Sequence, residues 1–476
     1  MVIRGTARRR FYACVRALFF LFLSIFMVVQ LLVTSFSSVS KLSHPENGSA
    51  SGSVDQNTVV LSMVPQGLHR FLTSTRSHNV TGTGANSTWE IQRQIEKYNS
   101  AQTILNEDIF GPLRNDSLVI IVQVHTRLRY LRHLIISLAQ VRDIDTVLLI
   151  FSHDYWDEEI NELVQSIDFC KVMQIFYPYS IQTHQDSFPG ESPNDCPRNM
   201  KKQDALTFGC NNAEHPDLYG HYREAKFTQT KHHWWWKANR VFNQLDVTRN
   251  FQGLVLFVEE DHFLAEDFLH TLNIMQKTVR QTCGQCNILS LGTYLKTYNY
   301  YADAKKRRHQ LMSSGLAAPV WSFQVLPSMY QQYVKAEITP WISSKHNMGM
   351  AFNRTVFESL VQCAPTFCSY DDYNWDFSLQ QVSNTCLQNK LVAFVLKGPR
   401  IFHIGECGVH HKNNCESTAV ISQVQKILQK ASRYFYPDHL SVTYSAVKKK
   451  PLKKGNGGWG DIRDHELCMN ITYYQR

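Results

Sequence analysis

An acidic cluster follows directly after an apolar run in the middle of the chain. Residues 254–258 are apolar, and the next four are Glu259, Glu260, Asp261 and His262. Carboxylates this close repel one another unless a cation compensates their charge. A divalent ion that also binds substrate phosphates does so, and carboxylate, imidazole and phosphate ligands suit Mn²⁺ or a similar ion. The cluster alone leaves two interpretations open, a metal site and a solvated acidic turn.

Two other apolar runs also end in polar residues. The run from residue 118 ends in Gln-Val-His-Thr-Arg at 123–127, and Asp154 follows the run at 146–151. Ligands of open α/β sheets bind beyond the carboxyl ends of the strands. At such an edge, a metal held by a carboxylate neutralises charge on the leaving diphosphate of a nucleotide sugar without proton transfer. The three segments together therefore favour sugar transfer from a nucleotide.

A sugar acceptor also needs a base to remove the proton of its hydroxyl group. Residues 370–376, Tyr-Asp-Asp-Tyr-Asn-Trp-Asp, offer three carboxylates among aromatic rings that pack on sugars. Paired carboxylates serve glycoside hydrolases equally well, so this segment by itself leaves hydrolysis open. His403, after the apolar stretch 391–395, is either an imidazole ligand of the metal or a buried core histidine.

The segment Lys231–Lys237 reads Lys-His-His-Trp-Trp-Trp-Lys and lies in a predicted helix. Adjacent histidines point in different directions on a helix, so a two-histidine metal site is disfavoured. The three tryptophans are expected in the core, whereas the polar residues beside them are within reach of a nucleotide.

The elements that must position these residues alternate between strand and helix, which predicts a doubly wound α/β core. A regular stretch at 90–105 is expected to begin the folded part as a helix, and 196–222 is expected to be a loop with its own cysteine pair. The predicted strands are 118–124, 146–151, 172–177, 254–258 and 288–291. Besides 90–105, the predicted helices are 130–138, 160–167, 224–245 and 267–279.

The charge pattern excludes a nucleic-acid-binding face. The formal net charge of the 476 residues is +9, but it is carried by an N-terminal arginine group and the lysine run at 448–454. The rest of the chain is close to neutral, so no basic surface is expected to follow a phosphate backbone. The arginines precede the uncharged residues 17–40, which suits a membrane anchor with a cytoplasmic N-terminus; a cleaved signal peptide is the alternative.

The membrane-anchor interpretation divides the chain into four predicted segments: a cytoplasmic tail (1–16), a transmembrane signal-anchor (17–34), a luminal stem (35–89) and a catalytic domain (90–476). Six Asn-x-Ser/Thr sites agree with a luminal location. Eleven cysteines follow the apolar run, so one is left unpaired in an oxidising lumen, and Cys170 is the expected one. Zinc-like spacings remain a less favoured alternative; they are Cys283-x-x-Cys286, the Cys363, Cys368, Cys386 group, and His403, Cys407, His410, His411, Cys415.

Several long segments resemble the N-acetylglucosaminyltransferase II family, over roughly residues 118–468 apart from an internal stretch. They are QVHTR at 123–127, IFSHD at 150–154, GHYREAKFTQTKHHWWWK at 220–237, EEDH at 259–262, LSLGTY at 289–294, HNMG at 346–349, YDDYNWD at 370–376, PRIFH at 399–403 and NGGWGDIRDHELC at 456–468.

The resemblance implies a GT-A fold with a Rossmann-like nucleotide-binding half and a mixed acceptor-binding half. It implies inverting β-1,2 transfer of N-acetylglucosamine from UDP-N-acetylglucosamine to the α-1,6-arm mannose of an N-glycan, in hybrid-to-complex glycan synthesis. The expected partners are that donor, the N-glycan of a glycoprotein and the Golgi membrane through one helix, with a homodimer left open and nucleic acid excluded.

By position, the resemblance also assigns roles. The catalytic base is Asp376, and the metal ligands, for Mn²⁺ or a similar ion, are Asp261 and His403. The donor contacts are Gln123, Val124, His125, Thr126, Arg127, Asp154, Gln229, Thr230, Lys231, His232 and His233. The glycan contacts are Arg198, Asp217, Glu259, Asn347 and Trp375. The disulfides are Cys196–Cys210, Cys283–Cys286, Cys363–Cys386, Cys368–Cys468 and Cys407–Cys415, which again leaves Cys170 unpaired.

The sequence departs from the family at three places. Thr126 and Leu128 replace Asn and Pro, and Tyr298 stands where the family has an arginine near the donor. The stretch 299–340 is longer than in relatives and holds the basic run 305–308, from which one charge is our hypothesis for a replacement of that arginine. Two rival functions remain: β-1,2 transfer to a different mannose, and non-catalytic glycan binding by a membrane-anchored protein.

Overall fold

The computed structural model describes residues 64–72, 87–294, 329–405, 417–445 and 454–473. The predicted membrane anchor, Tyr298, the basic run 305–308 and the Cys407–Cys415 pair lie outside these ranges. In the part of the chain that is described, no helix is both long and apolar enough to span a bilayer.

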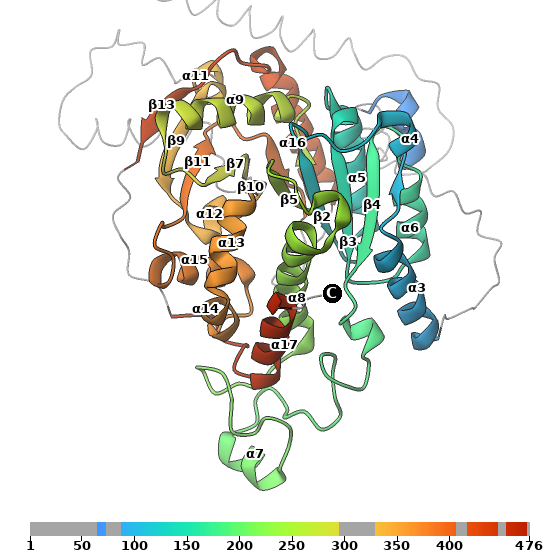
Figure 1. Cartoon of the computed structure of the whole chain (residues 1–476), viewed down its shortest axis with the longest axis vertical. Coiled ribbons are helices and arrows are strands. Elements are labelled where there is room, and N and C mark those ends of the chain that lie inside the picture. Colours follow the sequence, from blue (N-terminus) through green and yellow to red (C-terminus); the bar gives the residue numbers. More distant parts are fainter. Residues whose placement is uncertain (1–63, 73–86, 295–328, 406–416, 446–453, 474–476) are drawn as a thin grey trace, which may run out of the picture. The chain divides into compact units, whose positions relative to one another are not determined.

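Ten strands form one large sheet in the order β1-β4-β3-β2-β5-β10-β7-β11-β9-β13 (Figure 1). Four consecutive members, β4, β3, β2 and β5, run parallel and make up the Rossmann-like half. β10 is antiparallel to both its neighbours, and β9 is antiparallel to β11, so the second half is mixed. The expected α/β fold class is confirmed. The strands are β1 (Ile104–Leu105), β2 (Val119–Val124), β3 (Leu148–His153), β4 (Lys171–Phe176), β5 (Val255–Glu259), β7 (Ile288–Ser290), β9 (Lys335–Pro340), β10 (Met350–Phe352), β11 (Val392–Leu396) and β13 (Ser441–Tyr444).

A second sheet of three short strands lies beyond the end of β5. β12 (Ile401–His403) pairs with β6 (His262–Leu264) antiparallel and with β8 (Gly292–Thr293) parallel. In this register His403 lies directly opposite His262, 141 positions earlier in the chain. The small sheet thus joins the segment after β5 to the segment that carries the predicted metal histidine.

Helices cover both faces of the large sheet, and alternate strand residues pack against each set. On β2, Ile120 and Val122 belong to the core under α5 (Leu128–Ala139), α6 (Glu158–Gln165) and α9 (Phe268–Thr282). Val119 and Ile121 face the opposite core. That core contains α8 (Ala225–Asn239), α13 (Arg354–Gln362), α14 (Ala364–Ser369), α15 (Trp375–Thr385) and α17 (Ile462–Tyr473).

The tryptophans of α8 fill this second core, as the sequence predicts. Trp234 stacks on Trp375 with ring centroids 4.5 Å apart and planes inclined by 2°, and Trp235 stacks on Phe367 at 4.4 Å. Trp235 also donates from its indole nitrogen to Thr472 Oγ1 at 2.8 Å. The C-terminal helix α17 is therefore part of the core behind α8.

Most predicted element ends differ from the structure by no more than three residues, and three predictions differ further. The helix expected at 224–245 is α-helical only to Asn239 and continues as a π-helix, Arg240–Gln244. The helix expected at 90–105 is α3 (Thr88–Ala101), after which the chain forms the edge strand β1. Within the expected loop 196–222 lies the short helix α7 (Lys202–Phe208).

Part of the expected stem packs on the folded domain. Residues Gln66–Phe71 form a 3₁₀ helix, and Val64 and Phe71 are buried in the core under α5. Arg132 Nη1 donates to the carbonyl of Phe71 at 2.8 Å. The folded part of the chain therefore extends further toward the N-terminus than residue 90.

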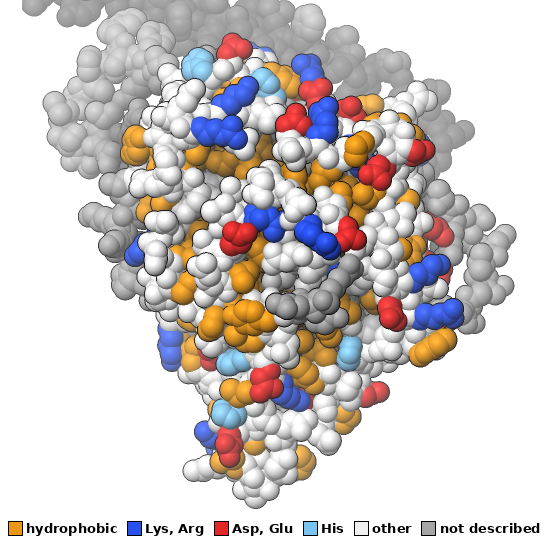
Figure 2. All heavy atoms as spheres, viewed as in Figure 1, with side chains coloured by type: hydrophobic (Ala, Val, Ile, Leu, Met, Phe, Trp, Pro, Cys, Tyr) orange, Lys and Arg blue, Asp and Glu red, His pale blue; other side chains and the backbone are white. Residues whose placement is uncertain are grey.

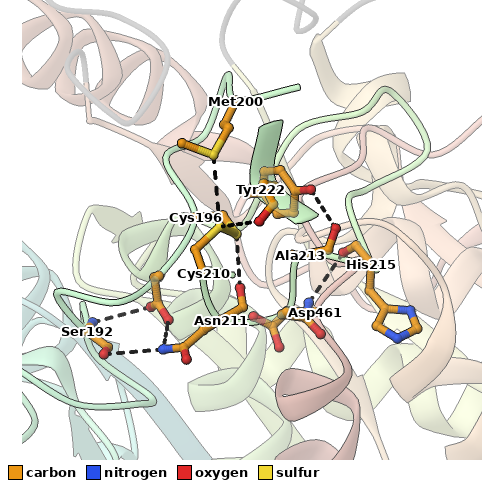
Figure 3. Close-up of a disulfide and its surroundings, with 12 residues drawn as sticks. Ser192, Cys196, Met200, Cys210, Asn211, Ala213, His215, Tyr222 and Asp461 are labelled. Carbon is orange, nitrogen blue, oxygen red and sulfur yellow. Dashed lines mark hydrogen bonds between the residues drawn. A yellow bond between two sulfur atoms is a disulfide. The ribbon is translucent and has the colours of Figure 1, made fainter. Parts of the chain in front are cut away.

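The described disulfides agree with the predicted pairing: Cys196–Cys210, Cys283–Cys286, Cys363–Cys386 and Cys368–Cys468. The zinc alternative is wrong for these eight cysteines, because their sulfur atoms bond to one another. Cys170 is free and buried, as predicted. Cys196–Cys210 closes the loop that contains α7. Figure 3 shows this disulfide beside Tyr222, whose hydroxyl donates to the carbonyl of Ala213 at 2.7 Å.

Candidate active site

The polar residues after β2, β3 and β5 meet at one edge of the sheet. β2 lies between the other two strands, and Gln123 is in register with Ser152 on one side and with Glu259 on the other. The three strands are parallel, so their carboxyl ends coincide, as the sequence predicts. Val124 is buried at the end of β2, whereas His125 and Thr126 are exposed on the loop that follows.

Asp154 is the centre of a hydrogen-bonded group at this edge. Its Oδ1 lies 2.7 Å from His125 Nδ1, and its Oδ2 accepts from Gln229 Nε2 at 3.1 Å. His233 Nδ1 lies 3.3 Å from the same Oδ2, and its Nε2 lies 2.8 Å from Ser152 Oγ. Burial opposes ionisation, but the two imidazoles outweigh it and hold the pKa of Asp154 well below its usual range. Asp154 is thus a fixed anion between the loop 125–127 and α8.

Glu260 fixes the shape of the same loop and was missed by the sequence analysis as a site residue. Its Oε2 accepts the backbone N–H of His125 at 2.9 Å and of Arg127 at 3.3 Å. The carboxyl is buried, which raises its pKa to about 7. The position of Glu260 between Glu259 and Asp261 is the sequence feature that could have identified it as a site residue. The sequence does not show that its carboxylate accepts backbone N–H groups.

Asp261 lies where a metal is predicted, and the residues around it fit one. Arg127 Nη1 donates to Oδ2, and His403 Nε2 lies 3.3 Å from the same oxygen. The other oxygen, Oδ1, is buried and has no hydrogen-bond partner among the described residues. A Cβ on Gly405 would come within 2.3 Å of Oδ2, so only glycine lets the chain pass there. The negative carboxylate thus keeps one oxygen free beside an imidazole.

Two neighbours of Asp261 complete a cluster of three residues. Ligand atoms of Glu259, Asp261 and His262 lie within 4.8 Å of one another. His262 was not predicted as a site residue; its Nδ1 accepts the backbone N–H of Glu259 at 3.2 Å, and burial lowers its pKa to about 3. His403 approaches the cluster from β12. Asp261 thus lies beside the neutral imidazole of His262 and a second carboxylate, Glu259, and its charge is compensated by the Arg127 guanidinium.

A buried lysine lies beneath this cluster and was also missed. Lys237 of α8 donates from Nζ to Gln123 Oε1 at 2.5 Å. Burial lowers its pKa to about 7, although the nearby Glu259 favours the charged form. Gln123 therefore connects the end of β2 to α8.

Asp376 is buried at the start of α15, on the second half of the sheet. Asn347 Nδ2 donates to its Oδ2 at 3.1 Å, and the backbone N–H of Phe377 donates to its Oδ1 at 2.9 Å. Burial, together with the negative charges of Asp372 and Glu259, raises the pKa of Asp376 to about 7. A carboxylate with such a pKa is able to accept a proton near neutral pH.

The predicted donor contacts on α8 divide between its two sides. Gln229 and His233 face Asp154, while Thr230 is half-buried. Lys231 and His232 point away from this edge. Lys231 Nζ donates to the carbonyls of Tyr370 and Asp372 at 3.1 and 3.0 Å, and His232 Nε2 lies 2.9 Å from Asp464 Oδ1. The two side chains thus connect α8 to the segment that precedes α15 and to the C-terminal helix α17.

The predicted glycan contacts also divide. Trp375 is a core residue under Trp234, and Asp217 accepts the backbone N–H groups of Tyr219, His221 and Gly458. Arg198 pairs with Glu224 at 2.9 Å and lines a cavity of about 430 Å³. The same cavity is lined by Asp217, Phe227, Tyr373 and Asn456. It offers aromatic rings and charged groups beside the loop that leads to Asp376.

Three comparisons with known proteins bear on this arrangement. A sequence model of N-acetylglucosaminyltransferase II (MGAT2) matches residues 92–324 and 321–468. The rat alpha-1,6-mannosyl-glycoprotein 2-beta-N-acetylglucosaminyltransferase is 43% identical over 392 residues, which are 82% of each chain. The Arabidopsis thaliana protein of the same name is 33% identical over 377 residues, 78% of each chain.

Among solved structures, S. aureus TarS 1–349 in complex with UDP-GlcNAc aligns over 66% of each chain at 10% identity, with a TM-score of 0.29. The residues that the family model matches include the segments that carry the Asp154, Asp261 and Asp376 groups. The chain therefore belongs to the N-acetylglucosaminyltransferase II family.

Proposed function

We propose that this chain transfers N-acetylglucosamine from UDP-N-acetylglucosamine, in β-1,2 linkage, to the α-1,6-arm mannose of an N-glycan, a step in hybrid-to-complex glycan synthesis. The proposal is supported by the family and by the name of the relatives. The observation that carries it is the buried carboxylate of Asp376, whose pKa of about 7 reflects burial and the nearby Glu259 at the end of β5. The carboxylate that we propose as the base and the carboxylate that we propose as a metal ligand thus lie near the same edge of the sheet.

The donor contacts we propose are the residues that surround Asp154 and Glu260. These are Gln123, Val124, His125, Thr126 and Arg127 on the β2 loop, together with Asp154, Gln229, Thr230 and His233. Lys231 and His232 are proposed to act indirectly, because their side chains are bonded to other segments. The role we proposed for the basic run 305–308 concerns residues outside the described part of the chain.

Asp261 and His403 are the proposed ligands of Mn²⁺ or a similar divalent ion. When bound, such an ion neutralises negative charge on the departing diphosphate. The free Oδ1 of Asp261 supports this assignment. Arg127, which lies on the other oxygen, adds positive charge at the same place.

In the reaction we propose, the acceptor hydroxyl oxygen forms a bond to the anomeric carbon of N-acetylglucosamine. The bond from that carbon to the diphosphate oxygen breaks, and its electron pair leaves with UDP. Asp376 accepts the hydroxyl proton, and Asn347 holds the carboxylate in place through Oδ2. The single displacement inverts the anomeric configuration.

The acceptor is proposed to bind along the cavity beside Arg198. Arg198, Phe227 and Tyr373 present a cation and two rings, and sugar rings pack on aromatic faces. Asn347 and Glu259 lie closer to the reacting hydroxyl. Asp217 and Trp375 are proposed to shape this region from behind, since both are engaged in the fold.

We further propose a single-pass type II protein of the Golgi membrane, with residues 17–34 as the anchor and the catalytic domain in the lumen. Four disulfides support an oxidising compartment. Figure 2 shows lysine and arginine interspersed with aspartate and glutamate on the face in view, in keeping with the predicted absence of nucleic-acid binding. A homodimer remains compatible with this assignment.

A defined acceptor tests the proposal. The full chain, in detergent, is incubated with UDP-N-acetylglucosamine, Mn²⁺ and an N-glycan that carries one N-acetylglucosamine on its α-1,3 arm. We expect a gain of one N-acetylglucosamine on the α-1,6 arm, no gain with EDTA, and none on the glycan that lacks the first sugar. Transfer only to another mannose would identify the rival transferase, and binding without transfer would identify a glycan-binding protein.

The pH dependence of transfer follows from Asp376. The base acts when it is ionised, and burial raises its pKa to about 7. We expect kcat/KM to fall about tenfold for each pH unit below 7 and to level off above it. Initial rates measured between pH 5 and 8 check this. A profile that is flat down to pH 5 would assign the proton to a different acceptor.

Substitution of Lys231 tests the proposal that only the side of α8 facing Asp154 contacts the nucleotide. In Lys231→Met, two buried carbonyl oxygens lose their donor, so the free energy of unfolding is expected to fall by ~1–3 kcal/mol. UDP affinity should stay within about twofold, since a change of ~0.4 kcal/mol or less is small for binding. Gln229→Ala, on the side of α8 that faces Asp154, should instead weaken UDP binding; it should also lower stability, because Gln229 Oε1 accepts the backbone N–H of Ile181 at 2.7 Å and Nε2 donates to Asp154. Titration of UDP and denaturant unfolding of both variants measure this.

A further inference from the structure

A groove lies at the end of the sheet opposite the candidate active site. Leu254, at the start of β5, lines it, whereas Asp261 follows the other end of that strand. The cavity measures about 780 Å³, within the range of ligand sites. We call it the amide groove, after the side chains that dominate its wall: Gln252, Gln276, Gln285, Asn353, Gln388 and Asn389.

The chemistry of the amide groove is that of a saccharide site. Its amides donate and accept hydrogen bonds, as sugar hydroxyl and acetamido groups do. Leu254 and Val392 offer aliphatic surface for the apolar face of a sugar ring, and Arg280 and Lys390 add two cations. No carboxylate is among the lining residues. A neutral, hydroxyl-rich ligand suits this wall better than a metal or a basic peptide.

Asn353, one of the lining residues, begins the sequence Asn353-Arg354-Thr355, an acceptor site for N-linked glycans. The side-chain oxygen of Asn353 caps α13, because it accepts the backbone N–H of Val356 at 3.3 Å. A glycan attaches to the other atom, Nδ2, so glycosylation leaves this cap in place. Arg354 Nη2 donates to the carbonyl of Thr248 at 2.8 Å, and Thr355 is exposed.

The other two acceptor sites in the described residues differ from this one. Asn115 and Asn470 are exposed, and the hydroxyl residue of each site is buried and bonded to the fold. Ser117 Oγ accepts the backbone N–H of Arg114, and Thr472 Oγ1 accepts from Trp235. At Asn353 the hydroxyl residue is free at the surface and the asparagine opens into a cavity of suitable chemistry.

We infer that Asn353 carries an N-linked glycan and that the first sugars of this glycan lie in the amide groove. The covalent bond supplies the occupant, because a sugar attached at Nδ2 is held at the groove wall. The inference rests on the luminal location proposed above. The groove is remote from Asp376 and Asp261, so loss of the glycan leaves the transfer rate unchanged.

Mass spectrometry of glycopeptides tests the modification. The full chain is produced in a host that glycosylates luminal proteins, as wild type, Thr355→Ala and the matched control Thr355→Ser. The glycan on Asn353 is expected in the wild type and the serine variant and absent from the alanine variant. If other sites are glycosylated and Asn353 is not, the inference fails and the luminal location stands. If no site is glycosylated, both fail.

Enzymatic deglycosylation tests the position of the sugars. A glycan held in the groove should be released about tenfold more slowly from the folded protein than from the denatured one, which corresponds to ~1.4 kcal/mol of binding. Asn389→Ala, at the groove wall, should speed release from the folded protein, and Asn384→Ala, an exposed asparagine outside the lining, should not. Equal release from folded and denatured wild-type protein would overturn the groove assignment.

Discussion

Asp376→Asn is expected to reduce kcat by ~10²–10⁴-fold while donor binding is retained. The amide cannot accept the proton of the acceptor hydroxyl, but it preserves the shape of the carboxylate. The backbone N–H of Phe377 can still donate to the amide oxygen, and Asn347, whose Oδ1 has no partner among the described residues, can turn to accept from the new NH2 group. The loss should therefore fall on the chemical step.

Single-turnover rates and UDP-dependent thermal stabilisation separate the two effects. The variant should show the wild-type increase in melting temperature with UDP and Mn²⁺, since ligands stabilise the state that they bind. Glu358→Gln, at an exposed carboxylate of α13, is the matched control and should transfer at the normal rate. Near-normal turnover in Asp376→Asn would remove this residue from the base role.

The same substitution should make the protein more stable above pH 7. Burial raises the pKa of Asp376 from 3.8 to about 7, so between these values the folded state binds more protons than the unfolded state. Wild-type stability therefore falls as pH rises through this window, by on the order of a few kcal/mol, and the asparagine variant does not share this loss. Melting temperatures measured from pH 4 to 8 should diverge in favour of the variant.

The contribution of Asp464 to stability should depend on pH in the opposite direction from that of Asp376. Burial disfavours its charge, but Arg223 and His232 outweigh this and lower its pKa to about 2. Its ionised form stabilises the fold, and that contribution is lost as pH falls through the folded pKa. Asp464→Asn should therefore destabilise the protein at neutral pH. The buried carboxylate of Asp376 thus costs stability at neutral pH, whereas the paired carboxylate of Asp464 adds to it.

The sequence predicts the Rossmann-like half well, for a local reason. Strands buried on both faces are continuous apolar runs, and the polar residues that follow them mark the ligand edge. Residues 123–127, Asp154 and Asp261 were placed correctly at that edge by this pattern alone. The tryptophans of α8 were also predictable as core, since large apolar side chains without polar partners are mostly buried.

Contacts between distant segments were not predictable from the sequence. The bonds of Lys231 to Tyr370 and Asp372 join residues about 140 positions apart, and no local pattern shows which side of α8 a polar residue takes. The pairing of β6 with β12, which brings His403 to Asp261, is likewise set by tertiary packing of two very short strands. Glu260 and Lys237 were missed for the same reason, because their partners lie on other elements.

Asp261→Ala is expected to abolish the metal-dependent part of UDP binding. The carboxylate is the buried anion of the site, and its Oδ1 is free for a cation. His403→Ala removes the proposed imidazole ligand and should weaken the metal dependence without eliminating it. With UDP at 100 times its dissociation constant, the wild type should gain ~2.7 kcal/mol from UDP and Mn²⁺, and Asp261→Ala should gain almost none.

Arg127 adds a positive charge beside Asp261, so UDP binding should also be measured with Arg127 substituted. Its guanidinium donates to Asp261 Oδ2, and removal of the carboxylate leaves a cation near the diphosphate position. We therefore expect Asp261→Ala to retain weak UDP binding that does not respond to Mn²⁺ or EDTA, and Asp261→Ala with Arg127→Ala to lose even this. Binding that is still strengthened by Mn²⁺ in the single variant would assign the metal to Glu259 and His262, the other members of the cluster. The Mn²⁺ dependence of UDP binding, rather than its strength, thus decides which carboxylate holds the ion.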